Sequence, residues 1–383
     1  MPLPPPSAEA QQHSDQLCQL IRGEIAANGG RISFARYMEL ALYAPGLGYY
    51  NAGARKLGAG GDFLTAPELS PLFGRTLAQQ AKQILVRGYD QILEIGAGSG
   101  ALAAALLEEL ERLGCLPRHY HILEISPDLR SRSRDRLAAH VPHLLERVAW
   151  LNQLPPAFSG LIIGNEVLDA MPVNVVVMRK RDILEADVQY AEDKNGFGWH
   201  ETRAPAPLRE AVSRLNLPAD NYRTEIGLAA QGFLRSLAST LQEGVALFID
   251  YGFPAREYYH PQRSQGTLMC HYRHHAHADP FFLPGLQDIT THVDFSAIAQ
   301  AGAAAGLEVL GYTSQAQFLV NCGITDLLAG TPADDPAYAR LAAGAQKLLS
   351  PAEMGELVKV IALGKGVSAP LLGFSKGERR HAL

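Results

Sequence analysis

The segment Gly96-Ala97-Gly98-Ser99-Gly100 has a residue pattern that lets a ligand approach the backbone closely. It follows the apolar run 91–95 and precedes a helix-forming stretch from Ala101, which predicts a strand, a tight turn and a helix. Glycine has no Cβ and adopts positive φ readily, so the chain can turn sharply beside a ligand. The same spacing also satisfies the dinucleotide pattern GxGxxG/A, so the loop alone leaves the cofactor class open.

Two glutamates near this loop favour one cofactor class. Glu94 stands two residues before Gly96, where a carboxylate can attract the ammonium of an amino-acid moiety and would repel a pyrophosphate. Glu124 lies at the end of the next predicted strand, where a carboxylate can accept hydrogen bonds from ribose hydroxyls. We therefore predict S-adenosylmethionine at Glu94, Gly96, Gly98, Gly100 and Glu124. The alternative for either glutamate is an exposed strand-end carboxylate without a ligand.

A second polar group, Asn165, Glu166 and Asp169, follows the apolar run 161–164. If residues 165–169 form a helical turn, Glu166 and Asp169 lie three residues apart on one face. Such a carboxylate pair could orient a guanidinium. Because the guanidinium has a pKa above about 12 and is protonated, it needs a nearby base to take its proton during methyl transfer. We therefore predict catalytic roles for these three residues. The alternative is that Asn165 or Asp169 only caps a helix.

Two further segments carry polar groups that could do chemistry. Asp250 follows the apolar run 246–249 and is a candidate for orienting substrate, with a capped turn as the alternative. Four histidines gather between His271 and His277, which suggests a metal site. No second cluster has zinc-ligand spacing, so we predict no metal there.

These residues need a sheet that brings the ends of several strands together. Apolar runs predict strands at 91–95, 119–125, 161–164, 246–249, 307–312 and 356–363. Helices are expected before and between these strands. Helical patterns occur at 15–27, 72–86, 101–113, 129–140 and 295–305, and another helix is expected after Ser33. This order predicts a Rossmann-like α/β fold with a mostly parallel sheet covered on both faces.

The expected domain plan has four parts. Residues 1–75 form an N-terminal helical region with a glycine-rich loop, and residues 76–182 and 240–366 form the core. Residues 183–239 form an insertion, in which Asn195-Gly196 is typical of a hairpin turn. Residues 367–383 form a C-terminal tail.

Composition narrows the class of protein. The 383 residues carry a formal charge of -5. The chain therefore lacks the excess of basic residues that is typical of a nucleic-acid-binding domain, and no nucleic-acid partner is expected. No apolar run reaches the roughly 18 residues of a membrane span, and the first residues do not resemble a signal peptide. The four cysteines are widely spaced without a CxxC pair, which fits a reducing compartment. We expect a cytoplasmic protein.

Six motifs together resemble the MidA-like class I methyltransferases, over residues 30–364. They are GDFLTAPELSPLFG, ILEIGAGSGALA, ILEISPDLR, IIGNEVLDAMPV, FIDYGFPAREYY and QDITTHVDF. The resemblance implies the class I sheet with an antiparallel last strand. It also implies that Phe63, Thr65, Pro67 and Glu68 belong to a lid over the cofactor, and that Asn165 lies near the transferred methyl.

The resemblance further implies a substrate class. Mitochondrial members of this family are complex I assembly factors that dimethylate an arginine of a core subunit. We therefore expect a protein side chain, an arginine, as methyl acceptor, with a complex I subunit as the narrower expectation. Two alternatives are a non-catalytic assembly chaperone that binds S-adenosylmethionine and a nicotinamide-dependent oxidoreductase.

Overall fold

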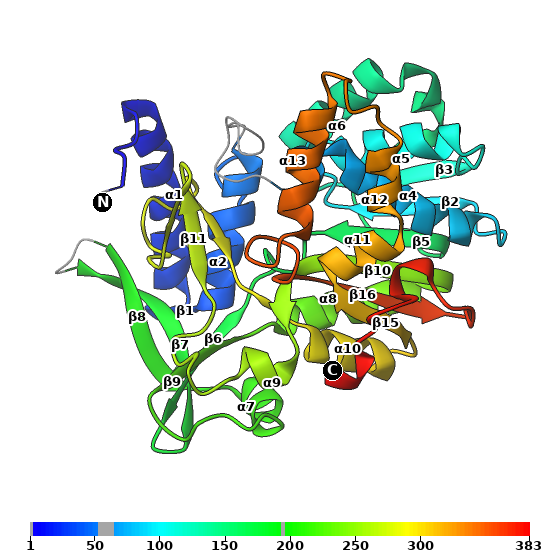
Figure 1. Ribbon diagram of the computed structural model, residues 1–383. Coiled ribbons are helices and arrows are strands. Elements are labelled where there is room, and N and C mark those ends of the chain that lie inside the picture. Colours follow the sequence, from blue (N-terminus) through cyan, green and yellow to red (C-terminus); the bar gives the residue numbers. More distant parts are fainter. Residues whose placement is uncertain (1–2, 53–64, 193–195) are drawn as a thin grey trace. The chain divides into compact units, whose positions relative to one another are not determined.

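The computed structural model describes residues 3–52, 65–192 and 196–383 (Figure 1). The chain divides into two compact units. Unit 1 comprises Met1–Phe63, Asp169–Gln231 and Ala255–Asp294, and unit 2 comprises Leu64–Leu168, Gly232–Pro254 and Phe295–Leu383. Each unit is therefore assembled from three separate stretches of the chain.

Unit 2 is an α/β sheet with helices on both faces. Its sheet strands are β2 (Gln91–Ile95), β3 (His119–Leu123), β4 (Val148–Leu151), β5 (Phe158–Asn165), β10 (Leu241–Phe253), β15 (Glu308–Ser314) and β16 (Val358–Lys365). Its helices are α3 (Ala66–Leu69), α4 (Pro71–Leu85), α5 (Ala101–Arg112), α6 (Pro127–His140), η2 (Pro142–Arg147), α10 (Phe295–Ala304), α11 (Gln315–Asn321), α12 (Ile324–Ala329), α13 (Tyr338–Leu349), η4 (Leu372–Phe374) and η5 (Arg380–Ala382). Helix α8 (Leu228–Thr240) enters it from unit 1.

The strand order in this sheet is β15-β16-β10-β5-β2-β3-β4. Strands β4, β3, β2, β5 and β10 pair in parallel, whereas β16 runs antiparallel to both β10 and β15. Figure 1 shows α4, α5, α12 and α13 on one face and α8 and α10 on the other. The nearly continuous burial of β5 and β10 agrees with a sheet covered on both sides. The predicted fold class is confirmed, including the antiparallel last strand.

Unit 1 is built on antiparallel strands. Its elements are α1 (Ala8–Ala27), β1 (Ile32–Ser33), α2 (Phe34–Tyr43), η1 (Tyr49–Asn51), β6 (Asn174–Arg179), β7 (Asp182–Ala191), β8 (Gly196–Arg203), α7 (Ala206–Ser213), β9 (Tyr222–Ile226), α9 (Ala255–Tyr258), β11 (Met269–Tyr272), β12 (His275–His277), β13 (Asp288–Thr290) and β14 (Val293–Asp294). One sheet has the order β1-β7-β6-β9 with β8 paired to β7, and a smaller one has the order β12-β11-β13.

Local sequence signals account for several of these elements. Ser7 and Ser33 cap α1 and α2 by accepting hydrogen bonds from backbone N–H groups three residues later. The expected hairpin is present as the antiparallel pair β7 and β8, although Asn195 lies outside the described residues. Within the part of the chain that the structure describes, no helix is long and apolar enough to cross a membrane.

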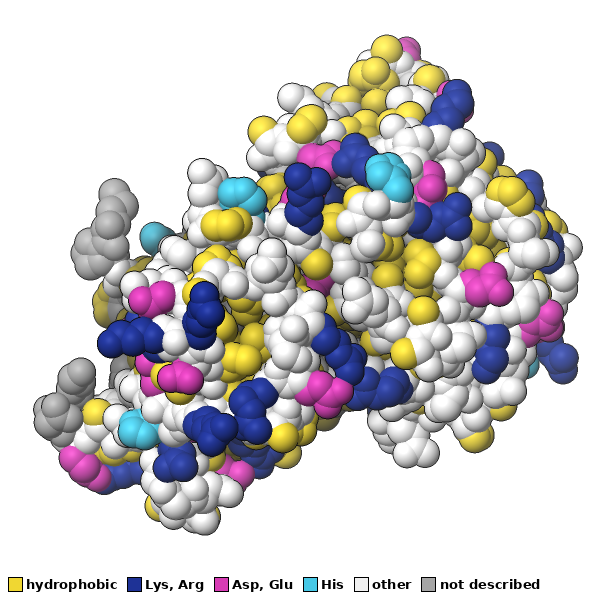
Figure 2. Space-filling model, turned by 90° about the horizontal axis from the view of Figure 1, so that it is seen from below, with side chains coloured by type: hydrophobic (Ala, Val, Ile, Leu, Met, Phe, Trp, Pro, Cys, Tyr) yellow, Lys and Arg dark blue, Asp and Glu magenta, His cyan; other side chains and the backbone are white. Residues whose placement is uncertain are grey.

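Charged side chains of both signs occur on the surface. In the face drawn in Figure 2, Lys and Arg side chains are interspersed with Asp, Glu and apolar ones. Most of the ion pairs among the described residues involve at least one half-exposed side chain, which limits what each contributes to stability.

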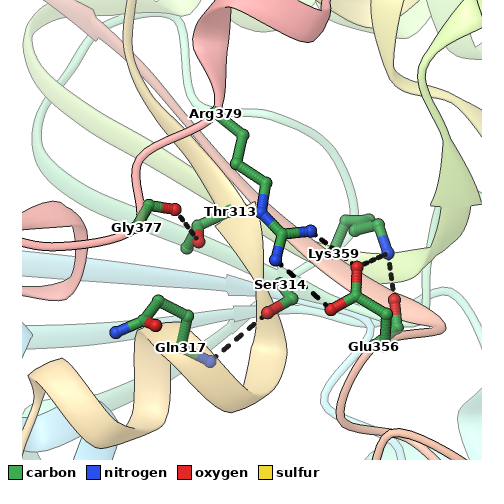
Figure 3. Close-up of polar contacts among 7 residues, drawn as sticks. All are labelled: Thr313, Ser314, Gln317, Glu356, Lys359, Gly377 and Arg379. Carbon is green, nitrogen blue, oxygen red and sulfur yellow. Dashed lines mark hydrogen bonds and ion pairs between the residues drawn. The ribbon is translucent and has the colours of Figure 1, made fainter.

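The C-terminal tail is part of unit 2 and is held by a polar network (Figure 3). Arg379 Nη1 donates to Glu356 Oε1 at 2.6 Å, and Lys359 Nζ lies 3.2 Å from the same oxygen. Thr313 Oγ1 donates to the Gly377 carbonyl at 2.7 Å, and the Arg379 N–H donates to the Tyr312 carbonyl at 2.7 Å. Lys359 is buried, so Glu356 supplies a carboxylate to an ammonium that is withdrawn from water.

Glu356→Ala is expected to lower the free energy of unfolding by about 1–3 kcal/mol, because the buried Lys359 ammonium loses this carboxylate. Arg379→Ala removes an exposed partner and should cost at most about 1 kcal/mol. Burial alone would raise the pKa of Glu356, but Arg379 and Lys359 together hold it below the ordinary 4.5. The stabilisation is therefore present at neutral pH and is lost as the pH falls below that value. Urea unfolding of both variants tests this, and equal losses would contradict it.

Candidate functional site

The glycine loop between β2 and α5 has the conformation that the sequence predicts. Gly96, Gly98 and Gly100 have φ of 67°, 53° and 81°, a region that residues with a Cβ rarely adopt. A Cβ at Gly100 would lie 2.9 Å from Ser133 Cα, and one at Gly96 would lie 3.1 Å from Val167 Cγ2. The loop therefore needs glycine both for its backbone angles and for its close neighbours, and it leaves backbone at the carboxyl end of β2 for a ligand.

Glu124 lies beside this loop. Its Oε2 accepts a hydrogen bond from the Gly98 N–H at 3.3 Å, and its Oε1 accepts one from the Ser126 N–H at 2.9 Å. Burial raises the pKa of Glu124, an effect that these two backbone donors partly offset. A carboxylate has about four acceptor positions, so Glu124 retains capacity for the hydroxyls of a ribose. This placement fits the predicted cofactor role, which stays a prediction.

Glu94 is more deeply enclosed than a strand-end carboxylate. It is 2% exposed and accepts a hydrogen bond of 2.6 Å from the hydroxyl of Tyr120 on the neighbouring strand β3. Burial raises the pKa of Glu94 to about 7. Tyr120 was not among the residues singled out in the sequence, although the alternation of buried positions in β3 places it on an inward face. The contact of Glu94 with a cofactor ammonium stays a prediction.

The segment after β5 differs from the expected helical turn. Glu166 has φ of 52°, and its N–H donates to the Ile249 carbonyl at 2.8 Å. The N–H groups of Val167 and Leu168 donate to Asp250 Oδ2 at 3.1 and 2.8 Å. The prediction of a helical turn over residues 165–169 is wrong: Glu166 has a left-handed backbone, and the segment between β5 and β6 contains no helix.

This geometry changes the roles open to the polar residues. No helix starts here for Asn165 to cap, and its Oδ1 is buried without a hydrogen-bond partner among the described residues. Glu166 Oε1 accepts hydrogen bonds from Asn165 Nδ2 at 3.3 Å and from the Ala66 N–H at 3.2 Å. Asp250 is 1% exposed and shapes the segment through its backbone contacts. The catalytic roles predicted for Asn165, Glu166 and Asp250 stay predictions.

The predicted lid residues are partly described. Thr65 precedes α3, Pro67 lies in it, and Glu68 forms an ion pair of 3.1 Å with Arg136 on α6. Ser99 Oγ in the glycine loop donates to Glu68 Oε1. Phe63 lies outside the described residues. The sequence motif therefore brings at least Glu68 to the glycine loop.

The remaining candidates lie in unit 1. Asp169 is 8% exposed, and its carbonyl accepts a hydrogen bond from the Thr291 N–H at 3.0 Å. The histidine-rich stretch forms the β11–β12 hairpin, which turns at Arg273 and His274 with φ of 46° and 63°. Across residues 3–52, 65–192 and 196–383, no group of three or more His, Cys, Asp or Glu side chains is arranged to hold a metal ion.

Comparisons with known proteins identify the family. Residues 72–313 match the S-adenosyl-L-methionine-dependent methyltransferase family Methyltransf_28, and the chain belongs to this family. Mitochondrial protein arginine methyltransferase NDUFAF7 of Mus musculus is 30% identical, with 87% of this chain and 81% of that protein covered. The Danio rerio protein of the same name is 29% identical, with 85% and 82% covered.

Two solved structures from Burkholderia thailandensis cover 100% of both chains. One, bound to S-adenosyl-homocysteine, is 49% identical with a TM-score of 0.96, and the other, a native structure, is 48% identical with a TM-score of 0.93. The chain is therefore a methyltransferase that uses S-adenosylmethionine, as the glycine loop together with Glu94 and Glu124 predicts. The nicotinamide-dependent alternative is set aside by the same findings.

Glu124→Ala is expected to weaken binding of S-adenosylhomocysteine by about 1–3 kcal/mol, because the carboxylate would lose paired hydrogen bonds to the ribose. Titration calorimetry measures the change. Glu243→Ala is a matched control, since Glu243 accepts a hydrogen bond from Tyr89 elsewhere in unit 2. Unchanged affinity in Glu124→Ala would remove the assignment.

Glu94→Gln should change how stability depends on pH. Because the pKa of Glu94 is raised from 4.5 to about 7, the folded protein binds more protons than the unfolded chain between these values. The stability contributed by Glu94 therefore falls as the pH rises through this window. The neutral glutamine avoids that loss, so without cofactor the variant should be more stable than wild type by about 1–3 kcal/mol at pH 8 and nearly equal at pH 5. A difference that stays constant with pH would refute the raised pKa.

Proposed function

We propose that this methyltransferase acts on a protein and that the acceptor is the guanidinium of an arginine side chain. Relatives named protein arginine methyltransferase align over most of their length, at 27–30% identity for the fly, zebrafish and mouse proteins. A subunit of respiratory complex I is the narrower proposal, which rests on the family resemblance alone.

The observation that carries the arginine proposal is that two aspartates of unit 1, Asp169 and Asp288, are buried. The Tyr50 hydroxyl donates to Asp288 Oδ1 at 3.0 Å. Burial raises the pKa of Tyr50 well above its ordinary value, and the charges of Asp288 and Asp169 raise it further. Both carboxylates therefore lie within electrostatic range of one phenol. Such a concentration of buried negative charge favours a cationic acceptor over a neutral hydroxyl.

The chemistry of the acceptor supports the same proposal. S-adenosylmethionine supplies an electrophilic methyl group on a sulfonium. An arginine side chain is protonated at neutral pH, so a carboxylate is needed to orient it and to take the proton that methylation releases. Asp169 is the proposed group for this step. A planar guanidinium also suits a pair of carboxylates better than a lysine ammonium does.

Asp169→Asn should lower turnover by about 10²–10⁴-fold, the usual range for losing a positioned base, while affinity for S-adenosylhomocysteine stays close to wild type. Methyl transfer from labelled S-adenosylmethionine to proteins of a cell extract measures turnover, and mass spectrometry identifies the methylated residue. Asp187→Asn is the matched control, because Asp187 is a buried aspartate of unit 1 that contacts Thr202. Methylation on lysine, or binding of cofactor without any methylated protein, would contradict the proposal.

A further inference from the structure

The short helix α3 is held at its first residue by the segment that follows β5. The Ala66 N–H is the first donor of the helix, and it has no acceptor within the helix because no carbonyl of the helix precedes it by one turn. Ala66 is 0% exposed, so this donor cannot rely on water. Glu166 Oε1 accepts its hydrogen bond at 3.2 Å.

The same helix is held to the glycine loop further along. Glu68 accepts a hydrogen bond from Ser99 Oγ and pairs with Arg136, whose guanidinium lies 3.1 Å away. The Glu68 side chain is only 13% exposed, so both contacts are partly shielded from solvent. Helix α3 therefore bridges two loops of unit 2, with Glu166 at one end and Ser99 at the other.

These contacts affect cofactor binding because ordering the glycine loop costs conformational entropy. Its three left-handed glycines have many other conformations available in a free loop. A hydrogen bond on Ser99 restricts that freedom before the cofactor arrives, and a loop that is already ordered binds more tightly. The anchor of α3 at Glu166 keeps Glu68 in place for this contact.

We propose that Glu166 is a positioning residue for the cofactor loop, acting through α3, rather than the group that binds the methyl acceptor. The left-handed backbone of Glu166 agrees with this role, since strained residues persist where the surrounding structure needs them. The proposal depends on the S-adenosylmethionine site and is independent of which acceptor the enzyme methylates.

The two roles of Glu166 predict different results for S-adenosylhomocysteine affinity, measured by calorimetry on the full chain. As a positioning residue, Glu166→Ala should weaken the affinity about 5–30-fold, in line with the loss of a hydrogen bond to a charged group. Glu166→Gln should restore most of it, because the amide oxygen still accepts from the Ala66 N–H. As an acceptor-binding group, Glu166 would leave the affinity unchanged in both variants while turnover falls in both.

Ala66→Pro removes the donor and leaves the carboxylate in place. Thr65 is extended, with φ of -80° and ψ of 161°, and the first helical position tolerates proline. The variant should reproduce the affinity loss of Glu166→Ala, and the double variant should lose little more than either single one. Additive losses would overturn the proposal, as would equal affinities of Glu166→Ala and wild type. If Ala66→Pro fails to fold in a thermal melt, the Ala and Gln variants of Glu166 decide the question.

Discussion

The capture of backbone N–H groups by Asp250 shapes the segment after β5, which in turn contacts the first residue of α3. The carboxylate accepts from Val167 and Leu168, while the Ile249 carbonyl accepts from Glu166. A buried carboxylate that accepts several backbone hydrogen bonds is a rigid support, because releasing it would leave both charge and donors unsatisfied. The left-handed backbone of Glu166 interrupts a helix at residues 166–168, and the Glu166 side chain accepts from the first N–H of α3. The cofactor loop and the segment after β5 are thereby held by one connected set of contacts.

The candidate cofactor-binding and acceptor-binding residues of the enzyme lie in two units with different types of sheet. Unit 2 carries the glycine loop, Glu94 and Glu124 on a parallel sheet, where neighbouring strand ends meet at one edge. Unit 1 carries Asp169 in the segment between β5 and β6, and Asp288, which accepts from Tyr50, at the start of β13. Parallel strands with helical crossovers suit a shared cofactor fold, whereas loops on a separate scaffold can diverge with the substrate. The family assignment accordingly specifies the cofactor more firmly than the acceptor.

The sequence predicts the parallel sheet well because its strands are mostly apolar, and because β2 is followed directly by the glycine loop and the start of α5. It does not predict β4, whose four residues are too few to show a periodic pattern, or the pairing of β1 with β7, which joins residues more than 150 positions apart. The predicted helical turn at 165–169 is wrong for a related reason. Glu166 is left-handed there, in a segment bonded to β10 more than 80 residues later, and no local signal reports such contacts. The sequence singles out Glu166, but its contact with the Ala66 N–H involves a backbone group that side-chain motifs do not display.

Asp250 is the central support of the segment after β5, and native-state amide hydrogen exchange of the Asp250→Ala variant tests this role most directly. The account predicts that the amides of Val167 and Leu168 lose protection, that the Ala66 amide loses it with them, and that the strand amides of β2 keep theirs. Unchanged protection at Ala66 beside exposed Val167 and Leu168 would show that α3 is held independently of this segment. Unchanged protection at all three would contradict the central role of Asp250.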